Sequence, residues 1–168
     1  DKTIEFVASN EDSDQPFFAY IPFQAVHIPV QAPKEYSDKY AGVYDEGWSV
    51  MREKRRQTAV ALGVIPKESE IKITPGTIDW SSMTDEQRRY DARRMEVYAG
   101  MVDAMDFHIG RLMDYLKSID EYENTVFIFT SDNGAASSPL LDSDGNSVLK
   151  NWFDRVGYNT DYESLGEK

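Results

Sequence analysis

"TVFIFTSDNG" (residues 125–134) joins a continuous apolar run to an aspartate, an asparagine and a glycine. Its first part, "TVFIFT" (125–130), is rich in β-branched and aromatic residues and predicts a buried strand. A second short apolar run, "PFFAYIPF" (16–23), is bounded by prolines and predicts another strand. Neither run alternates polar with apolar residues, which favours a parallel sheet that is covered on both faces.

Helical patterns lie between these two runs. The stretches 34–47 and 48–63 predict helices, the second of which closes on its final glycine. The strongest pattern begins at Thr84, which forms a capping box with Gln87, and runs to about Ser118. Its apolar residues recur at helical spacing on one face: Tyr98, Met101, Val102, Met105, Ile109, Leu112, Met113 and Leu116. Helices that connect parallel strands form right-handed crossovers, so the predicted fold is α/β, with a mixed, mostly parallel sheet flanked by helices.

The remaining segments give weaker patterns. Residues 1–8 suit either the tail of a helix or an edge strand. Residues 64–83 predict an irregular connection that Trp80 pins to the body of the protein. Near the C-terminus, 151–157 predicts one or two helical turns, and 158–168 predicts a loose end.

Length and composition exclude several classes of protein. A chain of 168 residues suits one domain with a real core. Its 18 basic and 30 acidic residues give a net charge of −12, which disfavours binding to nucleic acid. The sequence contains no cysteine, which excludes disulfides, thiolate zinc sites and a cysteine nucleophile. No apolar run approaches the ~20 residues that span a bilayer, so we expect no membrane segment.

Polar residues that follow the two predicted strands are the candidates for chemistry. In open α/β sheets, ligands bind at the carboxyl ends of the strands. The second strand leads into Asp132, Asn133 and Gly134, and its carboxylate and carboxamide are hard oxygen donors that suit Ca²⁺ or Mg²⁺. The alternative is that Asp132 caps the next segment and Asn133-Gly134 forms a turn.

The loop after the first strand carries His27, one of two histidines in the chain. Flanking prolines would fix this loop, as a positioned donor or general acid requires, although a histidine that merely packs fits equally. His108 lies along the long helix beside apolar residues, and we expect a structural role for it. The basic clusters 52–56 and 88–94 lie among acids and predict solvated helix faces, with Asp85 spaced to pair with Arg89.

Asp142, Asp144 and Asn146 have the alternate spacing of a calcium-binding EF-hand loop. However, Ser147 stands where that loop needs glycine, and no closing glutamate follows at the right distance. We therefore interpret "DSDGN" as a turn.

Three blocks in order resemble the arylsulfatases of the alkaline-phosphatase superfamily. They are the strand, histidine and prolines of "PFFAYIPFQAVHIPVQAP", the helix "MEVYAGMVDAMD", and "NTVFIFTSDNGA". The resemblance is clearest over residues 15–135, and 136–168 form an irregular C-terminal part. It implies a sulfatase-like α/β fold and hydrolysis of small-molecule sulfate esters.

The resemblance also implies roles for individual residues. Asp132 and Asn133 match ligands of a divalent cation, usually calcium and less often magnesium, that is held against the sulfate group. His27 matches the histidine that contacts the sulfate and is a candidate acid for the leaving oxygen. In this family the nucleophile is a formylglycine made from Cys or Ser in a C/S-x-P-x-R motif.

The departures from the family pattern are as informative as the matches. The chain has no cysteine and no serine followed by x-Pro-x-Arg, and "SSPLL" (137–141) lacks the arginine. The early aspartate pair and a later sulfate-contacting lysine also have no candidate, and Val26 replaces a frequent proline. We therefore interpret 1–168 as one fragment of a catalytic domain, inactive alone, whose partner is the remainder of a sulfatase chain and whose formylglycine lies on the missing N-terminal part.

Two alternatives stay open at this point. One is a segment of a phosphate or phosphonate ester hydrolase of the same superfamily, and the other is a non-catalytic sulfatase-like binding protein. The compartment is also open, with a periplasmic or secreted location favoured over a cytoplasmic one.

Overall fold

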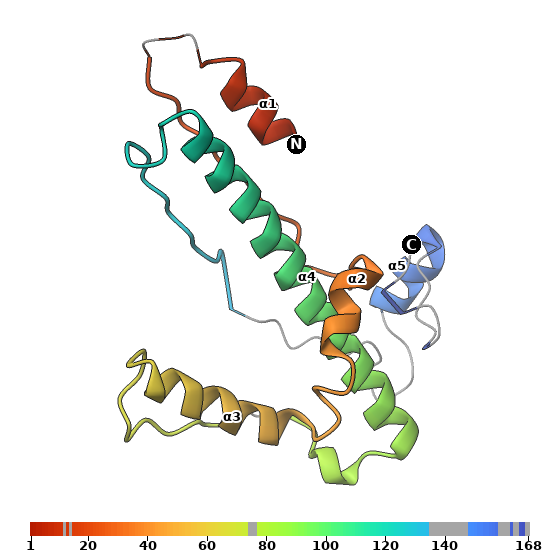
Figure 1. The fold of residues 1–168 in the computed structure, drawn as a ribbon. Coiled ribbons are helices and arrows are strands. Elements are labelled where there is room, and N and C mark those ends of the chain that lie inside the picture. The colour runs from red at the N-terminus through yellow and green to blue at the C-terminus, as the bar shows by residue number, and fades with distance from the viewer. Residues whose placement is uncertain are drawn as a thin grey trace. The chain divides into compact units, whose positions relative to one another are not determined.

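The structure, a computed structural model, describes residues 1–11, 13, 15–73, 77–134, 148–157, 162, 165 and 166. The chain divides into two compact units. Unit 1 comprises Asp1–His27 and Val102–Asn159, and unit 2 comprises Ile28–Met101 and Thr160–Lys168. The long helix α4 (Asp85–Ser118) contributes to both units (Figure 1).

Helix α4 has the bounds that the sequence predicts. At its start, the backbone N–H of Gln87 donates to Thr84 Oγ1 at 3.2 Å, and Gln87 Oε1 accepts from the backbone N–H of Thr84 at 2.8 Å. This reciprocal capping box satisfies two donors that the first turn would otherwise leave unpaired. Its predicted apolar face is buried or half-buried at every position except Val102, which is exposed.

Unit 2 is built from short helices around the first half of α4. Its core consists of Tyr44, Ala92 and Ala99, and partly buried apolar residues pack against it: Tyr40, Met51, Trp80 and Met95. Besides α4, the helical elements of this unit are α2 (Lys34–Ser37), η1 (Asp38–Tyr40), α3 (Trp48–Ala61) and η2 (Trp80–Ser82). Trp80 meets Trp48 edge-on with ring centroids 4.8 Å apart, which confirms that it pins the connection 64–83 to the body.

The helix predicted over 34–47 is wrong beyond its first two turns. After η1 the chain turns through residues 41–46, and both Gly42 and Gly47 have positive φ. The backbone N–H of Gly42 donates to Glu96 Oε1 at 2.8 Å instead of to a carbonyl one turn earlier. A tertiary contact from α4 therefore breaks the local helical pattern. By contrast, α3 ends at Ala61, with Gly63 in a left-handed conformation just beyond it, as the sequence predicts.

The prediction of a loose C-terminal end is wrong at Leu165 and Gly166. Leu165 is 3% exposed. The carbonyl of Gly166 accepts the backbone N–H of Ala32 at 3.3 Å, and its Cα lies so close to Val97 that a Cβ would meet that side chain at 2.7 Å. These contacts tie the described end of the chain to unit 2.

Unit 1 contains α1 (Lys2–Ala8), the second half of α4 and α5 (Val148–Val156). Val7, Leu116 and Phe153 are its buried apolar side chains among the residues that the structure describes. Arg111 forms an ion pair with Asp1 at 2.5 Å, and Tyr115 donates its hydroxyl to Glu11 at 3.1 Å. Residues 1–8 are thus mostly helical, and the predicted turns at 151–157 belong to a longer helix.

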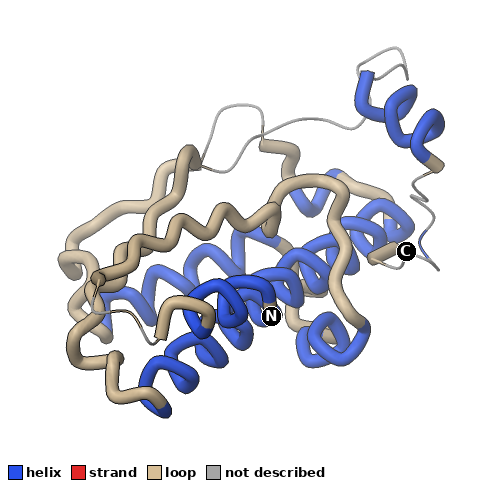
Figure 2. The backbone as a smooth tube through the Cα atoms, turned by 90° about the horizontal axis from the view of Figure 1, so that it is seen from above, coloured by secondary structure: helices blue, strands red, loops and turns tan. Residues whose placement is uncertain are grey.

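Neither apolar run forms a strand in the described part of the chain (Figure 2). Residues 16–23 and 125–130 are not helical, and the backbones of 16–23 and 126–130 make no hydrogen bond with another described residue. Their predicted burial is wrong for this chain, since Val126 and Ile128 are 85% and 86% exposed. The α/β fold stays a prediction. No described helix combines the length and apolarity that crossing a membrane requires.

The contact between α4 and α2 gives a test of the packing in unit 2. A Cβ on Gly100 would lie 2.8 Å from the backbone N and 2.9 Å from Cα of Ser37, whereas a Cβ on Gly110 of the same helix meets no atom within 4 Å. We expect Gly100→Ala to destabilise the protein by about 1–3 kcal/mol through overpacking. Gly110→Ala should stabilise it by up to about 1 kcal/mol through helix propensity. Urea denaturation of both variants checks this, and equal shifts in the midpoint would contradict the close approach.

Candidate functional site

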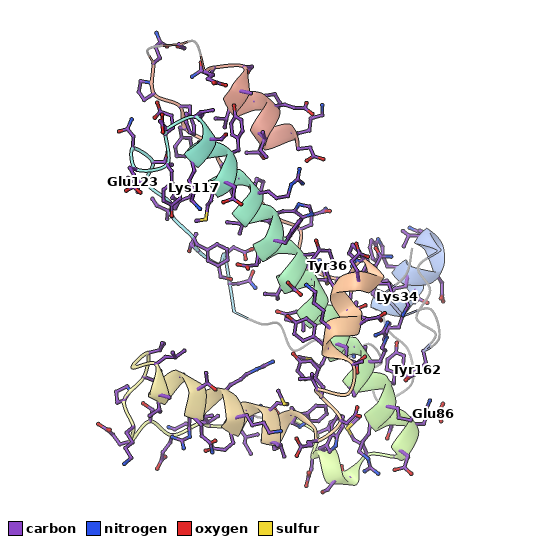
Figure 3. All side chains as sticks on the ribbon, in the orientation of Figure 1. Lys34, Tyr36, Glu86, Lys117, Glu123 and Tyr162 are labelled. Atoms are coloured by element: carbon purple, nitrogen blue, oxygen red, sulfur yellow. The ribbon has the colours of Figure 1, made fainter. Side chains whose placement is uncertain are left out.

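The candidate metal ligands lie on the segment that follows α4. The chain reverses after Ser118 through Asp120, whose φ of 58° is left-handed, and the N–H of Glu121 donates to the carbonyl of Leu116 at 2.9 Å. The rings of Tyr122 and Phe127 then lie 5.6 Å apart, and Lys117 Nζ lies 5.1 Å from the centroid of Tyr122. Figure 3 labels Lys117 near the end of α4 and Glu123 in the turn beyond it. These contacts fix only the beginning of the run 125–130.

Asp132 and Asn133 form a tight polar loop at the end of this run. Asp132 Oδ1 accepts the backbone N–H of Asn133 at 3.0 Å, and Ser131 Oγ donates to the carbonyl of Asn133 at 2.5 Å. The side-chain amide of Asn133 donates to the carbonyl of Gly134 at 2.6 Å. Both side chains are exposed. Asp132 Oδ2 and Asn133 Oδ1 remain without a partner in the part of the chain that the structure describes.

This loop has the donor chemistry of a hard cation but not a complete site. Carboxylate and carboxamide oxygens suit Ca²⁺, which takes 6–8 oxygen ligands. Among the described residues, no group of three or more acidic, histidine or cysteine side chains is placed to hold a metal ion. The loop therefore supplies two oxygens from adjacent residues, and the remaining ligands must come from elsewhere or from water.

His27 belongs to the same compact unit as Asp132 and Asn133. It is exposed, it follows the run 16–23, and its backbone N–H donates to the carbonyl of Gln24 at 2.7 Å. This bond closes a turn, which agrees with the predicted loop. All three predicted site residues are exposed, and they lie in the segments that follow the two apolar runs.

His108 lies on the exposed side of α4. Arg111 Nη1 lies 3.1 Å from its Nδ1, and the ring of Phe107 meets it edge-on. Both partners are neighbours on the same helix, and the predicted role for His108 stays a local structural one.

The basic clusters form helix ion pairs, with two differences from the prediction. Asp85 pairs with Arg88 rather than with Arg89. Arg93 pairs with Glu96 at 3.0 Å, with only 20% and 10% of these side chains exposed, so this part of the 88–94 cluster is not a solvated face. The turn predicted at 142–146 lies outside the described residues.

The sequence reasoning missed a cavity in unit 2. Trp48, Arg52 and Arg55 line it from α3, Trp80 lines it from η2 and Asp91 lines it from α4. The signal was present, because the apolar and basic residues of 48–55 recur at the spacing of one helix face. The basic residues of this stretch instead suggested a purely solvated surface.

Known proteins have sequences similar to this one. A family model described as Sulfatase matches residues 1–164. An uncharacterised sulfatase of Schizosaccharomyces pombe is 47% identical over 137 residues, covering 78% of this chain and 24% of that protein. An arylsulfatase of Klebsiella aerogenes is 34% identical over 155 residues, covering 92% of this chain and 32% of that protein. The chain therefore spans about a quarter to a third of the length of these relatives.

An incomplete ligand set has a measurable consequence. With two protein oxygens and water in the remaining positions, we expect the 168-residue chain by itself to bind Ca²⁺ with a Kd of about 1 mM or weaker. Isothermal titration calorimetry measures this directly. Micromolar binding would show that the chain holds a complete site, and Asp132→Ala would then locate it.

Proposed function

Because the chain belongs to the sulfatase family, we propose that it forms part of an enzyme that hydrolyses sulfate monoesters. The observation that carries this proposal is the family match over residues 1–164, which includes the loop of Asp132 and Asn133. The proposed substrate is a small-molecule sulfate ester of the arylsulfatase type. The partner that completes the enzyme is the remainder of a longer chain.

We assign Asp132 and Asn133 to cation binding. Their oxygens are exposed at the end of an apolar run, and one oxygen of each side chain has no described partner. Calcium is favoured over magnesium because it accepts a larger and less regular set of oxygen ligands. A bound divalent cation supplies positive charge that neutralises the sulfate oxygens. Each of the two side chains also makes a hydrogen bond to the backbone of the loop.

We assign His27 to contact with the sulfate group. An imidazole N–H can donate to a sulfate oxygen, and its protonated form can give a proton to the leaving oxygen. Exposure of His27 in the described part of the chain leaves its ring accessible to a ligand. The formylglycine nucleophile of this family has no precursor motif in the 168 residues, so the chain alone should not hydrolyse substrate.

The proposed fold of the complete enzyme is α/β, with 16–23 and 125–130 as strands. Exposed apolar residues in both runs support this, because an unpaired apolar strand exposes backbone donors and acceptors that a neighbouring strand can satisfy. Pairing would bring both loops to one edge of a sheet.

Replacement of Asp132 tests the cation assignment. In the full-length protein, Asp132→Ala should lower kcat/KM for an aryl sulfate by at least about 10³-fold and weaken Ca²⁺ binding, because the cation loses a charged ligand. Asp114→Ala, which removes another exposed carboxylate, is the matched control and should retain activity. Activity of Asp132→Ala within a few fold of wild type would remove this residue from the site.

Replacement of His27 tests the sulfate contact separately. His27→Ala should lower kcat by about 10²-fold without changing the unfolding temperature, because its side chain is exposed. His108→Ala removes the other histidine and should leave kcat unchanged. The rates should be measured with the sulfate ester and the phosphate ester of the same phenol. A wild-type rate for the His27→Ala protein would exclude His27 from the mechanism.

A further inference from the structure

The cavity of unit 2 shares no residue with the proposed catalytic loop. It has a volume of about 130 Å³. An apolar cavity of roughly 150 Å³ is known to hold benzene, so this space suits a single six-membered ring. Trp48, Trp80 and Tyr44 supply aromatic walls, and Met51 and Met95 supply apolar contacts.

The acids near the cavity are already paired with cations other than Arg52. Asp91, which lines it, forms an ion pair with Arg94 at 3.2 Å. The carboxylate of Glu53 accepts two hydrogen bonds from Arg56, at 2.9 and 2.8 Å, which together with Gln57 lower its pKa to about 2. Both carboxylates are thus engaged by arginines that do not line the cavity.

Arg52 is a cavity-lining arginine without an acidic partner among the described residues. It lines the cavity, it is half-buried, and it makes no hydrogen bond or ion pair with any residue that the structure describes. Arg55, beside it on the same wall, lies over the ring of Tyr44 at 5.9 Å and approaches the tyrosine hydroxyl at 3.5 Å. The chain as a whole carries a net charge of −12, whereas the two arginines give this aromatic cavity a positive charge.

We propose that this cavity binds a small aromatic carboxylate, with its ring against the aromatic walls and its carboxylate on Arg52. A guanidinium binds a carboxylate through two parallel hydrogen bonds, and aromatic walls favour a planar ring. A neutral apolar group in the same place would cover Arg52 and leave its charge unpaired, which is costly. The charge of Arg52 therefore selects an anionic ligand over a neutral one.

The test is titration of the full-length protein with 4-fluorobenzoate, followed by ¹⁹F NMR. The neutral isostere 4-fluorobenzamide is the ligand control. We expect saturable binding of the benzoate, weakened about tenfold by Arg52→Gln, while the benzamide binds weakly and equally to both proteins. Lys54→Gln removes a charge from the same helix outside the cavity and should leave binding within twofold of wild type.

Three outcomes would overturn the proposal. They are no saturable binding of the benzoate, equal effects of Arg52→Gln and Lys54→Gln, and loss of binding in Asp132→Ala, which would place the ligand at the catalytic loop. Circular dichroism should show an unchanged fold for Arg52→Gln, since the Arg52 side chain makes no described hydrogen bond or ion pair that the substitution would remove. Retained benzoate binding in an inactive Asp132→Ala protein would separate this site from the proposed sulfatase activity.

Discussion

Backbone hydrogen bonding by residues 125–130 is the constraint on which the candidate site depends. Every backbone N–H and C=O needs a partner, which water can supply to an exposed segment and which a neighbouring strand supplies in the proposed sheet. In the described part of the chain, the run finds none beyond Thr125. Asp132 and Asn133 follow directly, so the proposed pairing would set their position relative to any other ligand. The types of donor atom in the loop follow from its own residues, whereas the geometry of the proposed metal site would depend on other segments.

Prediction from the sequence was most accurate where the structure depends on contacts between residues a few positions apart. The reciprocal bonds of Thr84 and Gln87 involve neighbours three positions apart, and the apolar face of α4 follows from helical spacing alone. Prediction failed where a distant group intervenes. Glu96 takes the N–H of Gly42 across 54 residues, and Leu165 is buried although nothing in its surroundings in the sequence is periodic. Such contacts cannot be read from a local pattern, because the pattern does not contain the partner.

The same division applies to the site. The types of residue at 132 and 133 identify hard oxygen donors, and their place after an apolar run indicates where such donors act. The number of ligands could not follow from this, because the oxygens that would complete the shell of the proposed ion would come from separate segments. Arg52 was missed for the opposite reason. The acids near it in the sequence suggest a solvated helix face on which every arginine has an acidic partner. In the structure Glu53 pairs with Arg56, and Arg52 has no acidic partner among the described residues.

The two compact units differ in how much buried packing and backbone pairing they have among the described residues. Unit 2 has its own buried contacts, since Tyr44, Ala92 and Ala99 form a cluster and Gly100 lies directly against Ser37. Unit 1 holds the three proposed site residues on exposed segments, and its apolar runs lack pairing among the described residues. Residues whose side chains are exposed contribute little to stability, so we expect substitutions at His27 or Asp132 to act on the proposed function rather than on folding. The aromatic cavity lies in the unit with the buried cluster, so its walls are held by packing that is already complete within that unit.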